Sequence, residues 1–153
     1  MEEALVFREM VQIDYQALLD IWTITPGLTM RKADTHEGFS RFLKRNPGLS
    51  FVVETRGKVI GGILGGHDGR FGSIHHLVVL PEYRKQGIGK HLVRLCLKRI
   101  EATGVEKCHI FINRDNESGF HFWKTENWIE RTDLKMASFV FDEETHDSPI
   151  KQS

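Results

Sequence analysis

The sequence predicts an α/β protein in which helices flank a mixed, mostly antiparallel, twisted sheet. Apolar segments with strand-like alternation and segments with helical spacing follow one another in the order β-α-α-β-β-β-α-β-α-β(β). Strands joined by short turns come first, and a long helix that crosses over between two strands comes later. We therefore expect antiparallel and parallel pairs in one sheet of about six to seven strands, with about four helices around it.

The first elements are one strand and two short helices. Apolar and polar residues alternate over residues 5–10, which predicts a strand. Asp14 is expected to cap a helix with apolar residues at helical spacing, and Asp34 or Thr35 is expected to start a second helix. Two breaker sequences are expected to end these helices: Thr25-Pro26-Gly27 and Asn46-Pro47-Gly48.

Three strands joined by tight turns follow. Residues 49–54 and 58–66 surround Arg56-Gly57, which is a hairpin signal. A second turn, His67-Asp68-Gly69, precedes a strand at residues 72–80, because an Asp-Gly pair favours the backbone of a tight turn. These strands are therefore expected to pair antiparallel.

Helices and strands alternate in the rest of the chain. Residues 87 to about 103 are expected to form the longest helix, residues 107–113 a strand, and residues 118 to about 126 another helix. Residues 128–141 are expected to supply one or two more strands. After Asp142 the chain becomes polar.

Length and composition exclude several classes of protein. A chain of 153 residues fits one domain over residues 1–142 with a polar tail at residues 143–153. Basic and acidic residues both number 21, so the net charge does not indicate a nucleic-acid partner. Hydrophobic residues at 40% argue against disorder, and no apolar run approaches the roughly 18 residues of a membrane span. Cys96 and Cys108 form no CxxC motif and lie in apolar segments, as expected of a reduced, cytoplasmic protein.

The residues that indicate chemistry lie where the strand at 72–80 meets the longest helix. Gly87 and Gly89 allow a ligand to approach the backbone, and the first turn of a helix has unpaired N–H groups and a dipole that attracts negative charge. Three cations add to this charge: Arg84, Lys85 and Lys90. The segment predicts a phosphate or pyrophosphate site, although it matches neither a Walker loop nor a dinucleotide fingerprint.

Two segments together resemble the GCN5-related N-acetyltransferases, the GNAT superfamily. Arg84-x-x-Gly87-x-Gly89 is similar to the Arg/Gln-x-x-Gly-x-Gly/Ala signature of that family, and the strand before it reads Leu-x-Val-x-Pro-Glu-Tyr-Arg. Residues 116–128 resemble the family's Asn-x-x-Ala-x-x-x-Tyr-x-x-x-Gly-Phe segment. The order of elements also matches over roughly residues 4–141, so the chain resembles a small, single-domain, bacterial-type acetyltransferase.

The resemblance implies an acyl-CoA N-acyltransferase fold, acetyl-CoA as cofactor, and direct transfer of the acetyl group to a primary amine. The backbone of Leu77 and Val79 is implied to bind the pantetheine arm like an added strand, and the N–H groups of residues 85–90 are implied to bind the pyrophosphate. Asn116 is implied to contact pantetheine, with Asn113 at the mouth of the cleft. The full set of implied cofactor-binding residues is Leu77, Val78, Val79, Arg84, Lys85, Gln86, Gly87, Ile88, Gly89, Lys90, Asn113, Asn116 and Trp123.

Trp123 departs from the family pattern. It stands where the family usually has a tyrosine that is thought to protonate the departing CoA thiolate, and an indole N–H does not ionise usefully. A thiol has a pKa of about 8.5, so its thiolate can leave with little help. Trp123 is expected either to contact pantetheine or the acyl group, or to be part of the core. Asn127 replaces a family glycine, and asparagine can adopt the left-handed backbone of a helix C-cap.

Two adjacent histidines are the candidate catalytic residues. An attacking ammonium must lose a proton, and a histidine that titrates near pH 6.5 suits that role. His75 corresponds by resemblance to an active-site histidine of serotonin N-acetyltransferases and is the first candidate base; His76 is the second. Strand alternation predicts that their side chains lie on opposite faces of the sheet. The alternative for each is a hydrogen-bonded strand histidine without catalytic role, and no metal-binding spacing is present.

The acceptor amine is left open, as a small molecule or a protein. Trp22, Met30 and Phe39 are candidates for an apolar acceptor pocket, with ordinary helix packing as the alternative for the two aromatic residues. Asp34 is a candidate for attracting an amine. The resemblance also allows a homodimer. The alternative functions are a non-catalytic module that binds acyl-CoA, because Trp123 replaces the tyrosine, and a nucleotide-binding domain.

Overall fold

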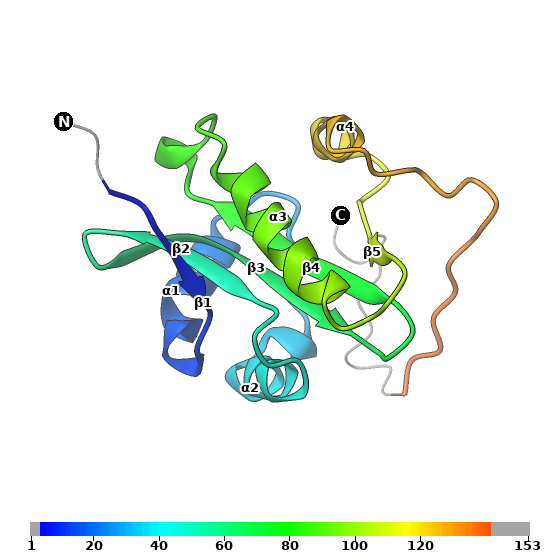
Figure 1. The fold of residues 1–153 in the computed structure, drawn as a ribbon, viewed down its shortest axis with the longest axis horizontal. Helices are drawn as coiled ribbons and strands as arrows, with labels where there is room; N and C mark the ends of the chain where they lie inside the picture. Colours follow the sequence, from blue (N-terminus) through cyan, green and yellow to red (C-terminus); the bar gives the residue numbers. More distant parts are fainter. Residues whose placement is uncertain (1–3, 142–153) are drawn as a thin grey trace. The chain divides into compact units, whose positions relative to one another are not determined.

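The structure is a computed structural model of the 153-residue chain that describes residues 4–141 (Figure 1). Its elements are β1 (Val6–Glu9), η1 (Gln12–Asp14), α1 (Tyr15–Thr23), η2 (Lys32–Asp34), α2 (His36–Arg45), β2 (Phe51–Thr55), β3 (Lys58–His67), β4 (Gly72–Val79), η3 (Pro81–Tyr83), α3 (Ile88–Glu101), β5 (Cys108–Ile110) and α4 (Glu117–Thr125), where η marks a 3-10 helix. The chain divides between Phe111 and Ile112 into two compact units. The first holds the sheet and the second holds α4.

The five strands form one sheet in the order β1-β2-β3-β4-β5. The first three pairings are antiparallel and β4–β5 is parallel. A mixed, mostly antiparallel sheet with four α-helices is confirmed, whereas the prediction of six to seven strands is wrong for residues 4–141. The additional strands were expected in residues 128–141, which have no strand structure. Alternating apolar residues alone do not make a strand, because a strand also needs a partner for its backbone N–H and C=O groups.

Both predicted tight turns are present. Arg56 and Gly57 have φ angles of 53° and 75°, as required by the two-residue hairpin turn between β2 and β3. In the turn between β3 and β4, Asp68 Oδ1 accepts hydrogen bonds from the backbone N–H groups of Arg70 (2.8 Å) and Phe71 (2.9 Å). These local bonds bring the three central strands into register.

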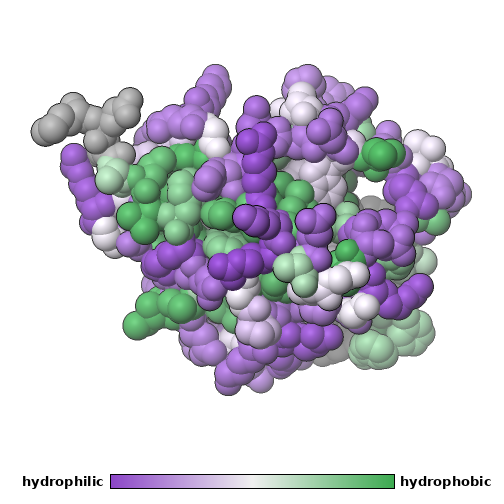
Figure 2. Space-filling view, viewed as in Figure 1, coloured by the Kyte–Doolittle hydropathy of each residue, from purple (hydrophilic) through white to green (hydrophobic). Residues whose placement is uncertain are grey.

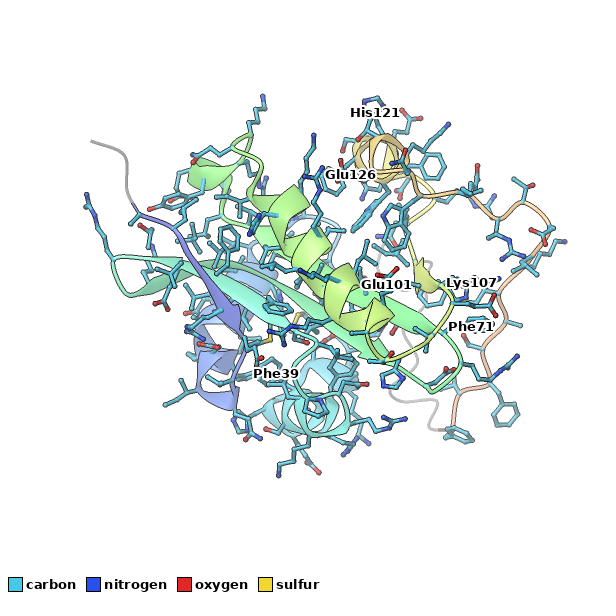
Figure 3. All side chains as sticks on the ribbon, in the orientation of Figure 1. Phe39, Phe71, Glu101, Lys107, His121 and Glu126 are labelled. Atoms are coloured by element: carbon cyan, nitrogen blue, oxygen red, sulfur yellow. The ribbon has the colours of Figure 1, made fainter. Side chains whose placement is uncertain are left out.

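β5 is shorter than the predicted strand at 107–113, because its pairing with β4 covers only three residues, Cys108–Ile110. Just before β5, the Lys107 carbonyl oxygen accepts a hydrogen bond from Gly72 N at 2.8 Å. Lys107 Nζ lies 5.2 Å from the centre of the Phe71 ring, and both side chains are labelled in Figure 3. These contacts fix the point at which β5 joins the sheet.

The glycines of β3 show which helices cover each face of the sheet. A Cβ atom at Gly62 would meet a side chain of α1, and one at Gly66 would meet a side chain of α2. Strand alternation places a Cβ at Gly65 on the opposite face, where it would meet a side chain of α3. α1 and α2 therefore cover one face and α3 covers the other (Figure 1). The largest fully buried side chains include Trp22, Phe39, Leu18, Ile60, Ile63, Ile74, Leu92 and Ile100.

α3 is amphipathic. Figure 2 shows mostly hydrophilic residues across the middle of the face on which α3 lies, in agreement with the exposure of Arg94, Lys98 and Arg99. Its opposite side buries Leu92, Cys96 and other apolar residues against the sheet. Of the helices in residues 4–141, none has both the length and the apolar composition needed to cross a membrane.

Two single-turn helices, η1 and η2, precede α1 and α2 and share one local structure. Asp14 Oδ2 accepts a hydrogen bond from Val11 N at 2.8 Å, and Asp34 Oδ2 accepts one from Arg31 N at 2.9 Å. Asp14 stands at the N-cap of α1, but its carboxylate caps η1 and makes no cap bond to α1. Thr35 does cap α2, because its hydroxyl oxygen accepts a hydrogen bond from the α2 backbone at 3.1 Å.

The second unit contains α4 and the chain that follows it. At the end of α4, Trp128 N donates to the Trp123 carbonyl oxygen and Asn127 N to that of Lys124, both at 3.1 Å. Asn127 has a φ of 70°, so the prediction of a left-handed C-cap is confirmed. Five large apolar side chains of the following segment are exposed: Ile129, Leu134, Met136, Phe139 and Phe141. The predicted tail at residues 143–153 lies outside the described residues.

Candidate functional site

One edge of β4 is unpaired over the second half of the strand. The pairing of β4 with β5 ends at Ile74, and no other strand of residues 4–141 pairs with residues 75–79 on that side. Towards β3, Val78 lies opposite Gly62 and Leu80 N donates to the Ile60 carbonyl oxygen at 2.8 Å. Backbone groups of successive strand residues point to alternate sides. The N–H and C=O groups of Leu77 and Val79 therefore face the unpaired edge.

This edge agrees with a strand-like ligand at Leu77 and Val79. Val78 differs from these two residues, because its backbone pairs with β3 and its side chain is buried in the core. Arg84 lies at the same edge, since its Nε donates to the Val79 carbonyl oxygen at 2.9 Å. An extended ligand that pairs with β4 would compete with Arg84 for this carbonyl.

His76 interrupts the regular pairing of β4 with β3. Gly62 lies opposite Val78 and Leu64 lies opposite His75, so His76 and Leu77 together oppose a single residue of β3. This arrangement is a β-bulge, a feature that is frequent beside active sites. His76 has a φ of 47°, in the left-handed region, where a non-glycine residue is strained by about 1–3 kcal/mol.

The bulge places both histidines on the face covered by α1 and α2. The His75 ring lies 5.7 Å from Phe42 of α2, and the His76 ring lies 5.1 Å from Trp22 of α1. The prediction that the two side chains lie on opposite faces is therefore wrong. Its physical reason is the extra residue of the bulge, which removes the two-residue alternation at this point.

His76 is paired with a buried carboxylate. Its Nε2 lies 2.8 Å from Asp34 Oδ1, and the two side chains are only 12% and 7% exposed. Burial by itself raises the pKa of Asp34, but the hydrogen bond and charge of His76 and the backbone N–H of Arg31 outweigh it and lower that pKa. Asp34 is thus a carboxylate with both oxygens engaged. Its contacts are with His76 and the η2 backbone, and its 7% exposure leaves little of it open to an acceptor amine, the role considered from the sequence.

His75 has a different environment from its neighbour. Its Nε2 lies 3.0 Å from Ser73 Oγ, two residues earlier on the same face of β4. Burial lowers its pKa below the ordinary value of 6.5, and the charges of His76 and Arg31 lower it further, against the opposing effect of Asp34. His75 is therefore neutral near pH 7. Within residues 4–141, no three His, Cys, Asp or Glu side chains are grouped so as to hold a metal ion.

The turn between η3 and α3 forms the second part of the site. Lys85 and Gly87 both have left-handed backbones, with φ angles of 63° and 80°. Gly87 is the N-cap of α3 and has no side chain with which to cap it. The first intrahelical bond joins His91 N to the Gly87 carbonyl oxygen at 3.1 Å. The N–H groups of Ile88 and Gly89 precede that bond, so they have no acceptor within the helix.

The surroundings of this turn fit a phosphate group. A Cβ atom at Gly87 would meet no other atom within 4 Å, so a ligand can reach the backbone. The positive end of the 14-residue α3 points to the same place. The exposed side chains of the turn include three cations: Arg84, Lys85 and Lys90. A free strand edge that leads into a cationic helix N-terminus can bind an elongated anionic ligand such as coenzyme A.

The second unit carries the other residues that the sequence implied for the cofactor. Asn116 is the N-cap of α4, and its Oδ1 accepts a hydrogen bond from Gly119 N at 3.0 Å. Trp123 is 6% exposed, and its ring centre lies 5.0 Å from those of both Phe122 and Trp128. Of the two roles considered for Trp123, packing is therefore the one visible within this unit. The backbone of Asn113 accepts a hydrogen bond from Asn116 N at 2.9 Å.

The aromatic residues considered for an acceptor pocket belong to the core. Trp22 and Phe39 are 1% and 2% exposed, which supports ordinary helix packing for both. Met30 is 38% exposed and remains at the surface.

Comparison with known proteins identifies the family of the chain. Residues 15–126 match the acetyltransferase (GNAT) family. The chain belongs to this family. An acetyltransferase of Pectobacterium atrosepticum is 32% identical over 116 residues, which cover 76% of this chain and 79% of that protein. An acetyltransferase of Photorhabdus laumondii is 31% identical over 143 residues, 91% of this chain and 92% of that protein.

The fold of this chain is also similar to solved structures of N-acetyltransferases. The PaiA N-acetyltransferase of Thermoplasma acidophilum, determined in complex with coenzyme A, aligns with a TM-score of 0.70 and 19% sequence identity. The alignment covers 80% of this chain and 88% of that one. The resemblance to GNAT proteins that the sequence motifs indicated is thus confirmed.

Sequence reasoning did not find the pairing of Asp34 with His76. The two residues are separated by 42 positions, and neither belongs to a motif that links them. It also missed Tyr15, whose hydroxyl donates to the Asp34 backbone carbonyl oxygen at 2.7 Å. No glycine marks the left-handed position of the bulge that brings His76 towards η2, so the sequence carries no clear signal for it.

Proposed function

We propose that this GNAT-family protein is an N-acetyltransferase that uses acetyl-CoA and transfers the acetyl group directly to a primary amine. The observation that carries the proposal is the unpaired edge of β4 at Leu77 and Val79, which leads directly into the uncapped, cationic start of α3. Family membership and the coenzyme A complex of a protein with the same fold support it.

The residues fit the parts of the cofactor. Backbone groups of Leu77 and Val79 would hold the amides of the pantetheine arm, and N–H groups of residues 85–90 would hold the pyrophosphate. The family resemblance adds Asn113, Asn116 and Trp123 of the second unit. Acetyl-CoA supplies an acetyl group that is already activated as a thioester.

Proton transfer is assigned to the histidines of β4. The acceptor amine is protonated near neutral pH, so a base must remove a proton before the nitrogen can attack. His75 and His76 both lie on the α1/α2 face, directly beside the unpaired edge of β4. No tyrosine stands at position 123, so the thiolate would leave without that general acid, as its pKa of about 8.5 permits.

Calorimetric titration with acetyl-CoA tests the cofactor site, with ATP as a control ligand. Asn tolerates a left-handed backbone, so Gly87→Asn keeps the turn but places a side chain in front of it. We expect micromolar binding by the wild type and at least tenfold weaker binding by Gly87→Asn. Gly57→Asn is the matched control, because Gly57 also has a left-handed φ of 75° and open space, but lies in the hairpin turn.

The outcome also separates acetyl-CoA use from nucleotide binding. No binding of acetyl-CoA by folded wild-type protein, or equal loss in Gly57→Asn, would contradict the proposal. Binding of ATP alone would favour a nucleotide-binding domain.

A non-catalytic acyl-CoA-binding module is the second candidate, and the observation that favours it is Trp123 at the tyrosine position. Release of free CoA from acetyl-CoA, measured with a thiol reagent over a panel of primary amines, distinguishes the two. The panel should contain polyamines, amino acids, aminoglycosides and peptides with free N-termini or lysines. CoA release that depends on one class of amine supports an enzyme, and binding without release from any amine supports the module.

A further inference from the structure

We propose that Asp34 is a positioning residue of the transfer reaction, which fixes the His76 ring so that its Nδ1 takes the proton from the acceptor amine. The inference rests on the proposed acetyltransferase function and deepens it. It selects His76 over His75 as the base and gives a role to a carboxylate that sequence motifs did not indicate.

The Asp34 carboxylate is held rigidly. Arg31 N donates to its Oδ2 at 2.9 Å within η2, and the Tyr15 hydroxyl donates to its backbone carbonyl oxygen at 2.7 Å from α1. Its remaining oxygen, Oδ1, lies 2.8 Å from His76 Nε2. The carboxylate is 7% exposed, so water competes little for that oxygen. Two elements therefore fix the direction from which Asp34 meets the ring.

This pairing selects one tautomer of His76. A carboxylate has no proton to donate, so the neutral ring must carry its proton on Nε2 and donate it to Oδ1. Nδ1 is then the nitrogen with a free electron pair. Among residues 4–141, the hydrogen bond of the His76 ring is made through Nε2. Nδ1 is therefore the nitrogen that can accept a proton from a bound amine. A carboxylate that orients a histidine base is a known catalytic arrangement.

The backbone of His76 supports a functional role. His76 is strained at a bulge, where β4 has already separated from β5. Such strain persists only where the surroundings hold it, and it is concentrated at functional sites. The neighbouring Trp22 ring carries a buried Nε1 without a hydrogen-bond partner among the described residues. Buried polar atoms of that kind are rare in protein interiors and also mark places where a ligand or water binds.

In the proposed step, one N–H proton of the ammonium moves to Nδ1 of His76. The electron pair that stays on the nitrogen forms the new C–N bond to the acetyl carbon, and the C–S bond breaks with its pair on sulfur. The second proton lost by the nitrogen ends on the thiolate or in solvent. Asp34 stays deprotonated and stabilises the imidazolium that forms. His75 does not take this role, because its ring is bonded to Ser73 and has no carboxylate partner.

Asp34→Asn tests the inference, and Asp14→Asn is its matched control. An asparagine at 34 has one oxygen for two donors, the N–H of Arg31 and the Nε2–H of His76. Because the capping turn fixes the Arg31 N–H, the amide NH2 is expected to face Nε2 and to move the ring proton to Nδ1. Asp14 is 4% exposed and caps η1 in the same way, but it pairs with Arg8 instead of a histidine.

The position of the ring proton is read by nitrogen NMR of the imidazoles at about pH 8.5, where free histidine is neutral, without cofactor or acceptor. The signals of His76 are those that disappear in His76→Gln. We expect Nδ1 to show the shift of an unprotonated nitrogen in the wild type and in Asp14→Asn, and the shift of a protonated nitrogen in Asp34→Asn. A wild-type ring with its proton on Nδ1 would overturn the inference even if Asp34→Asn does not fold.

The last part of the test measures kcat and KM of the wild type and the variants, with the amine that gives the fastest CoA release as acceptor. Asp34→Asn and His76→Gln should each lower kcat by about 10²- to 10⁴-fold with little change in the KM for acetyl-CoA. Asp14→Asn should keep its kcat although it loses stability. Full kcat in Asp34→Asn, or a larger loss in His75→Gln than in His76→Gln, would overturn the inference alone. A wild type that releases no CoA with any amine would overturn the proposed function as well.

Discussion

His75 and His76 are adjacent in sequence but differ in backbone, partner and charge environment. His75 has a regular strand backbone and contacts Ser73 and Phe42. His76 is in a strained, left-handed conformation and is paired with Asp34. The single extra residue of the bulge thus gives two adjacent imidazoles different surroundings. These different surroundings lead to separate predictions.

His75 should make folding stability depend on pH. Burial lowers its pKa below 6.5, so the folded state binds its proton less readily than the unfolded state. The stability that a neutral His75 contributes is complete above pH 6.5 and is lost as the pH falls from 6.5 towards the lower folded-state pKa. His75→Gln removes this contribution. Between pH 7.5 and pH 5.5 the wild type should therefore lose more of its free energy of unfolding than His75→Gln does.

Urea unfolding followed by circular dichroism at the two pH values measures this difference. His121→Gln, which removes an exposed imidazole from α4 (labelled in Figure 3), is the control for the loss of one histidine. A His75→Gln variant whose stability follows the same pH dependence as the wild type would contradict the prediction.

At the scale of single elements, short-range bonds at helix ends and turns decide where elements begin and stop. Thr35 caps α2, Asp68 closes the turn before β4, and Asn127 ends α4. Each of these residues could be predicted from the sequence, because the side chain bonds to backbone only a few positions away, or adopts a backbone that few residue types tolerate.

Asn127 provides a quantitative test of the α4 C-cap. Its φ of 70° is tolerated by asparagine and by glycine but opposed by a Cβ-bearing apolar residue. Asn127→Ala should lower the free energy of unfolding by about 1 kcal/mol, whereas Asn127→Gly should leave it unchanged or raise it slightly. Thermal unfolding of the three proteins gives the comparison. Equal stability of the alanine and wild-type proteins would contradict a left-handed C-cap.

The two neighbouring glycines of β3 test the packing of the helices on the two faces of the sheet. A Cβ at Gly65 would collide with Cys96 Sγ and with the backbone carbonyl oxygen of Leu49, which cannot move independently. A Cβ at Gly66 would lie 2.9 Å from the ends of the Asn46 and Phe42 side chains, which can shift more easily than backbone even though the Asn46 amide is hydrogen-bonded.

Gly65→Ala should therefore cost about 3 kcal/mol of stability and Gly66→Ala about 1 kcal/mol. Urea unfolding of the two variants is the measurement, and each serves as the control for the other. A larger loss in Gly66→Ala would mean that α3 packs less closely on β3 than the structure shows.

The elements that sequence reasoning misjudged depend on partners that lie far away in the chain. Residues 128–141 carry the apolar residues of a strand, but within the described residues no strand pairs with them. The bulge at His76 depends on how β4 meets β3, and a sequence pattern with a period of two cannot show an inserted residue. In both segments the sequence shows the alternation of residue types, but it does not show which strand pairs with which, or in what register.

At the scale of the whole molecule, the family could be predicted, because the motifs at 77–90 and 116–128 lie within short stretches of chain. The succession of the five strands along the chain could be predicted from local patterns as well. The arrangement around His76 could not. It joins β4 to η2 through the Asp34 contact and to α1 through Trp22. Contacts of this kind exist only once the sheet and its helices have packed together.

The residues proposed to bind the cofactor come from both compact units, and this gives the last prediction. Leu77, Val79 and residues 85–90 belong to the first unit, whereas Asn116 and Trp123 belong to the second. If both sets bind acetyl-CoA, the ligand must slow amide hydrogen exchange in both units at once. At a ligand concentration of about 100 times Kd, binding contributes about 2.7 kcal/mol, or about 100-fold slower exchange of amides that open only in the free protein.

Hydrogen exchange measured by mass spectrometry, with and without acetyl-CoA, tests this expectation. Peptides that cover residues 77–90 and residues 116–123 should both be protected in the wild type and unprotected in Gly87→Asn, while ATP should protect neither. Protection confined to residues 77–90 would remove Asn116 and Trp123 from the site, and would leave Trp123 as the packing residue that its contacts with Phe122 and Trp128 already indicate. Protection of residues 116–123 would instead make Trp123 part of the acyl-CoA site, where an indole replaces the phenol that the family usually provides.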